Sequence, residues 1–299
     1  MKKILITGGS GLLGSNLAIR LCKSYNVLIL LNLKKINIPL TISASSSESL
    51  EKIFSSFKPD LVINTVALTN IETCEDYPDL ASKINVNFLK SLVKVSKKFS
   101  GKIVHISTDH LFDGNTPFVN EKNILYPLNQ YAKTKAQAEE FIKNEMPEAL
   151  ILRTNFFGWG PVYRKSFSDQ IIDSVNNQKK IYLFKDAFFN PISLRTFSNI
   201  LVKLFDNKAN GVFHLAANDR VSKFEFGIML CNYFKLNQKY IIGINVKDKK
   251  ELANRPLDTS LDNEKIRNLL NYDCGTVLEN ISHLALDIKD GLKDDIMKL

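Results

Sequence analysis

Short apolar runs alternate with longer segments of helical periodicity along the first half of the chain. The apolar runs predict buried strands at five places: Lys3–Thr7, Val27–Leu31, Leu61–Asn64, Lys102–Ser107 and Ala149–Arg153. The amphipathic segments between them predict helices, the longest from about Asp79 to Phe99, and Ser43–Ser47 reads as a short loop. Strands separated by helices predict an α/β fold with a doubly wound parallel sheet, because each crossover helix covers one face of the sheet.

The pattern changes after Arg153, where an aromatic and glycine-rich loop runs from Phe156 to Pro161. Helices are then predicted near Phe167–Asn176, Phe197–Phe205, Phe224–Phe234 and Leu278–Leu286. We therefore expect residues 1–154 to form the sheet domain and residues 155–299 to form mainly a smaller mixed α/β domain. No linker marks the boundary, so later segments can return to the first sheet.

The composition of the 299-residue chain is that of an ordinary globular protein. Hydrophobic residues make up 44% and charged residues 24%, which excludes a disordered or fibrous chain. No apolar run approaches the ~20 residues that span a bilayer, so no membrane segment is expected. The cysteines Cys22, Cys74, Cys231 and Cys274 are scattered without metal or disulfide spacing, which favours a reducing, cytoplasmic location.

The formal net charge is +9, and basic and acidic residues are interspersed along the chain. Neither zinc-finger spacing nor an aromatic RNA-binding signature accompanies this charge, so nucleic acid is not an expected partner. The phosphates of a cofactor or of a substrate fit the charge better. A merely solvated basic surface is the alternative.

A glycine motif, GxxGxxG from Gly8 to Gly14, follows the first predicted strand and opens the first helix. Glycines there permit a tight turn, and the helix N-terminus attracts a pyrophosphate. The usual dinucleotide motif is one residue tighter, and a plain glycine turn is the alternative. The position of the motif at the start of a strand–helix alternation favours dinucleotide binding and a Rossmann-type fold.

A second constellation joins Thr108, Tyr131 and Lys135. Tyr131 and Lys135 are four residues apart, so they share one face of a predicted helix. A phenol titrates near ~10, and a neighbouring ammonium is expected to lower that pKa. About one such Tyr–Lys pair is expected by accident in this lysine-rich chain, and an exposed helical face is the alternative. The context favours catalysis, because Thr108 ends a predicted strand 23 residues before Tyr131, and both follow the glycine loop in the sequence.

With these motifs, the sequence resembles the extended short-chain dehydrogenases/reductases, and within them the dTDP-4-dehydrorhamnose reductase family. The resembling stretches follow the family's order over most of the chain: Ile4–Gly14, Asn64–Glu75, Ser107–Gly114, Pro127–Glu139, Leu152–Gly158 and Arg255–Ile266. The resemblance implies that the second domain binds the substrate.

The resemblance also implies a role for each matching residue. Thr108, Tyr131 and Lys135 match the catalytic residues. The residues that match the cofactor site are Gly8, Ser10, Gly11, Leu12, Leu13, Val66, Ala67 and Leu68, with Tyr131 and Lys135 beside the nicotinamide ribose.

On the substrate side, Asp109, His110 and Phe156 fall where the family contacts the sugar, beside Thr108. Arg255 falls where an arginine holds the pyrophosphate of the nucleotide sugar, for which a guanidinium is well suited. The alternative for Arg255 is a turn before a helix capped by one of the residues 258–260.

Two departures concern the sugar. The family usually carries tyrosine at the position of His110 and tryptophan at that of Phe156, so the identity of the sugar stays open. We expect Trp159 to pack its loop, and His105 and His214 read as structural. No cluster of carboxylates and histidines indicates a catalytic metal.

The function implied by the resemblance is NADPH-dependent reduction of a nucleotide-activated 4-keto-6-deoxysugar, in deoxysugar or polysaccharide biosynthesis. Related dehydratases place Asp-Glu after the threonine, whereas Asp109-His110 follows Thr108 here, which favours simple reduction. Two alternatives stay open: a nucleotide-sugar epimerase or dehydratase, and a nonreactive regulatory binding subunit. The expected partner is the nucleotide sugar, and a homodimer is also open.

The end of the second strand generates a prediction about the cofactor. Asn32 stands where NAD-specific folds carry an acidic residue, and Lys34 and Lys35 follow. A modest preference for NADPH over NADH is expected, shrinking as salt rises, because lysine acts as a screened point charge. The ratio of kcat/KM for the two cofactors, at two ionic strengths, measures it. A preference for NADH, or an unchanged ratio in Lys34→Ala/Lys35→Ala, would contradict the assignment.

Overall fold

A seven-stranded parallel sheet forms the centre of the computed structural model, which describes all residues except 32–35, 37, 39–40, 46–48 and 250. The strand order is β11-β6-β5-β4-β1-β2-β3. The bounds are β1 Lys3–Thr7, β2 Asn26–Leu31, β3 Thr41–Ser45, β4 Leu61–Asn64, β5 Lys102–Ile106, β6 Leu150–Thr154 and β11 Gly211–Leu215. This sheet confirms the predicted Rossmann-type α/β fold.

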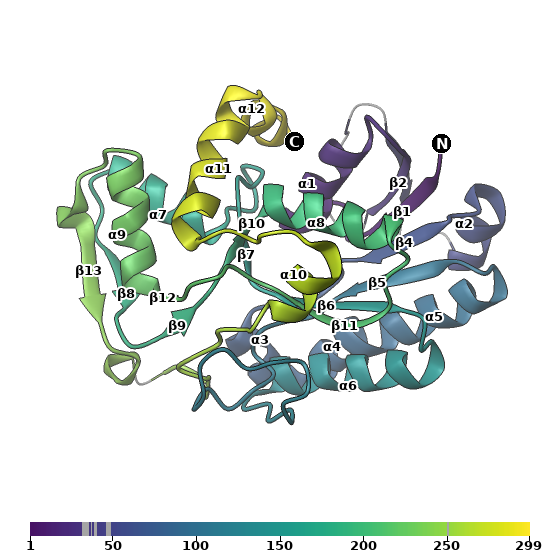
Figure 1. Ribbon diagram of the computed structural model, residues 1–299, viewed down its shortest axis with the longest axis horizontal. Coiled ribbons are helices and arrows are strands. Elements are labelled where there is room, and N and C mark those ends of the chain that lie inside the picture. The colour runs from purple at the N-terminus through teal and green to yellow at the C-terminus, as the bar shows by residue number, and fades with distance from the viewer. Residues whose placement is uncertain (32–35, 37, 39–40, 46–48, 250) are drawn as a thin grey trace.

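Helices cover both faces of the sheet (Figure 1). On one face lie α1 Leu12–Leu21, α8 Leu194–Asp206, α10 Glu264–Leu270 and α12 Leu292–Met297. On the other lie α2 Leu50–Phe57, α5 Phe88–Lys98 and α6 Gln130–Glu145. The two cores follow from alternation along β1, since Ile4 and Ile6 enter one core and Leu5 enters the other.

The long helix predicted from Asp79 to Phe99 contains a wider turn. After α3 Ile71–Asp76, the chain forms α4 Pro78–Ser82, the π-helical turn η1 Lys83–Asn87, and then α5. Such a turn inserts an extra residue into a helix and is frequent at functional sites. Asn85 lies within it, and its amide binds both the N–H and the C=O of Leu68, at 2.7 and 3.1 Å.

The second half of the chain builds a smaller unit beside the sheet, on the left of Figure 1. Its helices are α7 Phe167–Asn176, α9 Lys223–Tyr233 and α11 Val277–Lys289, with the short helices η2 Gln238–Tyr240 and η3 Val246–Asp248. Its strand pairs are β8 Ile181–Phe184 with β13 Ile241–Ile244, β9 Phe188–Phe189 with β12 Val221–Ser222, and β7 Phe156–Phe157 with β10 Ile192–Ser193. Between these segments, β11 returns to the main sheet beside β6. Trp159 packs as predicted: it is buried, and its indole N–H donates to the Leu284 carbonyl at 3.0 Å.

One local expectation and one alternative were wrong. Of the predicted loop 43–47, residues 43–45 belong instead to β3, which pairs with β2, and residues 46–47 lie outside the described residues. This edge strand was missed because its serines give no apolar signal. Residues 258–260 do not cap α10, because its N-cap is Asn263 and the Asp258 carboxylate instead accepts a hydrogen bond from the Ser260 hydroxyl at 2.6 Å. Within the described ranges, no helix is long and apolar enough to cross a membrane.

A buried ion pair joins α6 to β6. The Arg153 guanidinium donates from Nε and Nη2 to the two Glu139 oxygens, at 2.9 and 2.7 Å, and both side chains are at most 2% exposed. Burial opposes ionisation of Glu139, but the Arg153 hydrogen bonds and charge hold its pKa at about 2. Arg153 also donates from Nη1 to His214 Nε2 at 3.2 Å, and burial and this charge lower the pKa of His214 to about 3.

Removing one partner of this pair leaves the other buried and uncompensated. We expect Arg153→Met to lower the free energy of unfolding by ~3–5 kcal/mol, and Arg153→Met/Glu139→Met to recover much of the loss. Urea unfolding of the two variants and wild type measures both effects. A single variant within ~0.5 kcal/mol of wild type would show that the pair does not hold α6 to the sheet.

Candidate active site

A cavity of about 880 Å³ opens at the carboxyl edge of the sheet, around the ends of β1, β4 and β5. At β1 the strand order reverses direction, and this is where open α/β sheets bind ligands. Residues from separate stretches of the sequence line this one cavity: Gly8, Ser10, Gly11, Leu12, Leu13, Val66, Ala67, Leu68, Thr108, Asp109, His110, Tyr131, Lys135 and Phe156.

Arg255 is not among the residues that line the cavity. Its guanidinium forms an ion pair with Glu72 of α3 and donates to the Ala253 carbonyl at 3.1 Å. Its contact with a pyrophosphate stays a prediction. Asn32, Lys34 and Lys35 lie outside the described residues.

The glycine loop has the backbone shape that a diphosphate needs. Gly8 has φ +73°, and a Cβ at Gly14 would lie 2.3 Å from the Gly8 carbonyl oxygen, so the helix packs against the loop only without side chains. Gly11 is the N-cap of α1 and supplies no side-chain cap. The N–H groups of the first turn are therefore left for a ligand, and the positive helix end faces the cavity.

Thr108, Asp109 and His110 follow β5 at the other side of the cavity. The buried Asp109 carboxylate accepts from the Thr108 hydroxyl at 3.2 Å and from the Asn155 amide at 2.9 Å. His110 Nε2 lies 3.9 Å from the same carboxylate. Burial lowers the pKa of His110, Asp109 opposes the shift, and Lys223 and Arg255 add to it, so the imidazole is neutral at pH 7.

Tyr131 and Lys135 point inward from α6, and both are buried. Burial raises the pKa of the Tyr131 phenol, while a hydrogen bond with Thr108 opposes the rise. The ammonium of Lys135 donates to the Ile106 carbonyl at 2.6 Å, and burial lowers its pKa to about 8. The expected lowering of the Tyr131 pKa is therefore wrong, because burial raises this pKa and the opposing contribution comes from Thr108.

Sequence reasoning missed two residues that act on the lining of the cavity. Asn85 fixes the backbone of Leu68, and Lys223 extends from the start of α9 with its ammonium 3.1 Å from the centre of the Phe189 ring. Burial lowers the pKa of Lys223 to about 7, and Asp109 opposes the shift. No local pattern marks these positions, because their partners are distant in the sequence.

Some buried polar atoms at the cavity wall have no hydrogen-bond partner in the part of the chain that the structure describes. They include His110 Nδ1 and Thr154 Oγ1, and both residues line the cavity. Unpaired buried polar atoms are costly, so they fit a site that a polar ligand completes.

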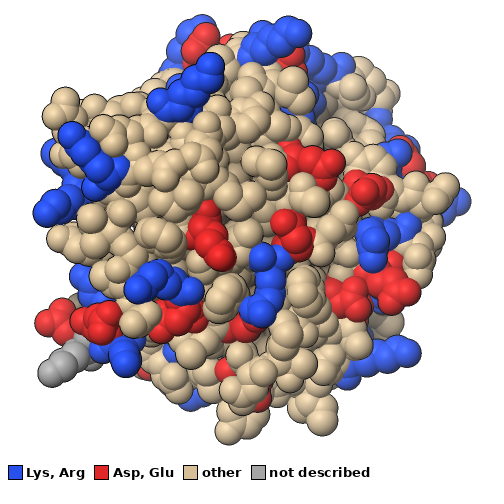
Figure 2. All heavy atoms as spheres, turned by 60° about the vertical axis from the view of Figure 1, so that its left-hand side comes forward, with Lys and Arg blue, Asp and Glu red and all other residues tan. Residues whose placement is uncertain are grey.

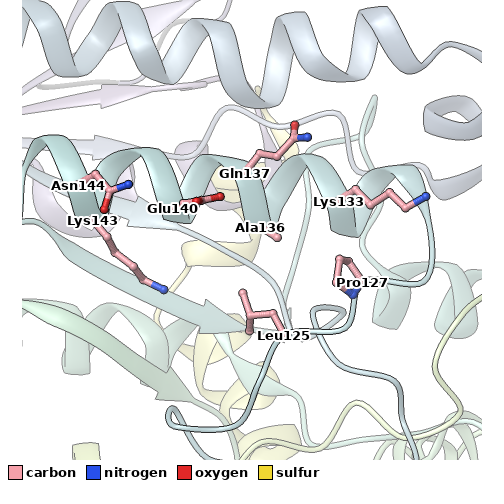
Figure 3. Close-up of a pocket in the computed structure, with 8 residues that line it drawn as sticks. All are labelled: Leu125, Pro127, Lys133, Ala136, Gln137, Glu140, Lys143 and Asn144. Atoms are coloured by element: carbon pink, nitrogen blue, oxygen red, sulfur yellow. The ribbon is translucent and has the colours of Figure 1, made fainter.

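Another hollow, of about 480 Å³, lies on the outer side of α6 (Figure 3). Lys133, Glu140 and Lys143 line it from the helix, and Leu125 and Pro127 line it from the preceding loop. None of the predicted site residues belongs to this hollow. Figure 2 shows acidic and basic side chains interspersed over the face turned forward, as the sequence indicated.

A sequence model described as the RmlD substrate binding domain matches residues 1–286. The chain belongs to this family. A similar relative of this RmlD-family chain is dTDP-4-dehydrorhamnose reductase from Aggregatibacter actinomycetemcomitans, 27% identical over 282 residues, which cover 89% of this chain and 92% of that protein. A crystal structure described as a hypothetical dTDP-4-dehydrorhamnose reductase from Sulfolobus tokodaii is 30% identical, with a TM-score of 0.81, over 94% of this chain and 99% of that one.

Another relative of the RmlD-family chain is named as a subunit of a transferase rather than as a reductase. Methionine adenosyltransferase 2 subunit beta from Rattus norvegicus is 24% identical over 279 residues, which cover 90% of this chain and 82% of that protein.

The shape of the glycine loop can be tested by substitution. In Gly8→Ala the new Cβ would lie 2.8 Å from Thr65 Oγ1 at a positive φ, so strain of ~1–3 kcal/mol should weaken binding of a dinucleotide by ~10-fold or more. Gly275→Ala is the matched control, since Gly275 has a similar φ of +74° but lies outside the cavity. Fluorescence titration with NADPH measures both. Equal affinities in the two variants would contradict this account of the loop.

Proposed function

We propose that this chain is an NADPH-dependent reductase of a nucleotide-activated 4-keto-6-deoxysugar, which serves deoxysugar or polysaccharide biosynthesis. The observation that carries the proposal is that Thr108, Tyr131 and Lys135 line the same cavity as the glycine loop. The names of the reductases described above support the reaction class.

Different parts of the cavity would hold the diphosphate and the nicotinamide half of the cofactor. The N–H groups at the start of α1 would hold the diphosphate, beside Gly8 and Gly11. Val66, Ala67 and Leu68 would line the nicotinamide half, with Leu68 fixed by Asn85. When bound, NADPH supplies a hydride to the keto carbon.

Tyr131 would act as the general acid. Reduction turns the keto oxygen into an alkoxide, which needs a proton as it forms. Because burial raises the pKa of the phenol, Tyr131 holds its proton at neutral pH and can donate it. Thr108 would orient the keto oxygen by its hydroxyl, and Lys135 would bind the nicotinamide ribose and stabilise the phenolate that remains.

Asp109, His110 and Phe156 would contact the sugar. His110 is neutral at pH 7 and lies edge-on to the Tyr131 ring, with the ring centres 6.1 Å apart. A neutral imidazole here supplies no carboxylate base for removing water, which favours reduction without dehydration. Arg255 would bind the pyrophosphate only after giving up its ion pair with Glu72.

One alternative has a specific observation behind it. The similarity to methionine adenosyltransferase 2 subunit beta favours a chain that serves as a subunit of another enzyme. The Thr108, Tyr131 and Lys135 set argues against it, since a binding subunit has no need of a general acid. A protein that binds NADPH but oxidises none with any nucleotide 4-ketosugar would favour the subunit.

We also propose a cytoplasmic location and leave the homodimer as a second proposal. The location is supported by the four cysteines, which are buried and form no disulfide. Sedimentation of the purified chain measures the oligomeric state.

The proposed acid gives a direct test. Tyr131→Phe removes the phenolic proton and conserves the ring, so we expect turnover to fall by ~10²-fold or more with NADPH affinity nearly intact. Tyr126→Phe is the matched control, because Tyr126 is 64% exposed and outside the cavity, and should keep wild-type turnover. Steady-state kinetics with a panel of nucleotide 4-ketosugars measures both. Near-normal turnover in Tyr131→Phe would rule out the role.

A further inference from the structure

A line of buried polar side chains lies directly behind Lys135 and crosses three strands. It runs from Thr7 on β1 through Asn64 on β4 to His105 on β5, and each is at most 1% exposed. The Thr7 hydroxyl donates to Asn64 Oδ1 at 2.8 Å, Asn64 Nδ2 lies 3.1 Å from His105 Nδ1, and His105 Nε2 lies 3.4 Å from Lys135 Nζ. No pattern in the sequence connects His105 with Lys135.

The orientation of the Asn64 amide follows from its other neighbour. The backbone N–H of Val66 donates to the Asn64 atom that also contacts Thr7, at 3.3 Å. A backbone N–H can only donate, so that atom is the oxygen, and the amide nitrogen faces His105. The amide nitrogen also only donates, so His105 Nδ1 accepts and the neutral ring carries its proton on Nε2.

The Nε2–H group then faces the Lys135 nitrogen. An ammonium offers only protons to this group, whereas a neutral amine offers a lone pair that can accept the hydrogen bond. The Ile106 carbonyl accepts from Lys135 at 2.6 Å in either state. This tautomer of His105 therefore opposes the charged form of Lys135 without removing its anchor.

We propose that Asn64 and His105 are positioning residues that act through Lys135: Asn64 fixes the His105 tautomer, and that tautomer sets how readily Lys135 releases its proton. The consequence for catalysis rests on the proposed function, whereas the tautomer and the titration of Lys135 do not. Burial, and then the charge of Lys135, keep the pKa of His105 well below its ordinary value, so the ring stays neutral while Lys135 titrates.

Other charged groups near His105 and Lys135 also affect the pKa of Lys135. On α6, Glu139 raises the pKa of Lys135, but Arg153 and Lys143 pair with the same carboxylate. Tyr131 is protonated in the range where Lys135 titrates.

Groups on neighbouring elements bear on Tyr131 rather than on Lys135. They are Asp109, which follows β5, and Cys74 on α3, and both raise the pKa of Tyr131. Lys83 of η1 is a further charged residue that lines the cavity. His105 is thus the neighbour of Lys135 whose hydrogen bonding a single substitution can invert.

Asn64→Asp performs that inversion while conserving the side-chain shape. The aspartate keeps an oxygen for Val66 and Thr7, and its second oxygen accepts from His105 Nδ1–H. The ring then presents a bare Nε2 to Lys135, which favours the ammonium, and the new carboxylate charge favours the ammonium as well. We expect the apparent pKa of Lys135 to rise by ~1 unit or more. Thr7→Val is the matched control, because it removes one donor to Asn64 and leaves the amide facing His105.

Nitrogen NMR of the full chain, labelled in its four histidines, tests this without substrate. In the wild type we expect a protonated Nε2 and a bare Nδ1 for His105, assigned by comparison with His105→Gln. The Nε2 resonance should shift with a midpoint near pH 8, as Lys135 titrates. In Asn64→Asp the proton should move to Nδ1 and the midpoint should rise, whereas Thr7→Val should change neither.

A wild-type ring protonated on Nδ1 would overturn the proposal, and this outcome needs no variant to fold. An equal midpoint in Asn64→Asp and wild type would also overturn it. A raised midpoint with the His105 proton still on Nε2 would overturn it too, because the carboxylate charge alone would then account for the rise. Under the proposed function, the alkaline limb of the kcat/KM profile should move to higher pH in Asn64→Asp, together with the NMR midpoint. Absence of turnover together with the expected NMR result would refute the reductase and leave the roles of Asn64 and His105 standing.

Discussion

Burial of the inner face of α6 against the sheet is the constraint on which the site depends. Four polar side chains lie on that face, and buried polar groups must find partners. Thr134 accepts from Asn85 at 2.9 Å, Lys135 donates to the Ile106 carbonyl, and Glu139 pairs with Arg153. These partners come from η1, β5 and β6, so they fix both the height and the rotation of the helix. Tyr131, one turn before Lys135, is carried to the cavity by the same alignment.

The order of the strands brings the two ends of the site together. Because β1 lies beside β4 and β4 beside β5, the glycine loop, the segment 66–68 and Thr108 all leave the same edge of the sheet. One cavity therefore contains both backbone N–H groups that can bind a diphosphate and a phenol that can donate a proton. Burial raises the pKa of that phenol and lowers that of Lys135. The phenol therefore stays protonated, and Lys135 loses its proton more readily than Tyr131.

The sequence predicted the parts of this arrangement that have a local signal. Strands with continuous apolar runs, the glycine loop and the Tyr131–Lys135 spacing are all properties of short segments. The rest depends on contacts between distant segments. His105 meets Lys135 across 30 residues, and Asn85 meets Leu68 through a π-helical turn that helical periodicity does not reveal. Lys223 lies on α9 in the smaller unit, and its charge acts on His110. Strand β3 was missed because its sequence, TISAS, has no continuous apolar run.

In the proposed reaction, NADPH bound in this cavity gives a hydride to a ketosugar, and the chain protonates the product. The most direct measurement is the reaction of nucleotide 4-keto-6-deoxysugars with NADPH deuterated at the transferred position. We expect one NADPH to be oxidised for each product formed, and deuterium to appear on the former keto carbon. Product formed without net oxidation of NADPH, or binding of NADPH with no oxidation at all, would contradict it.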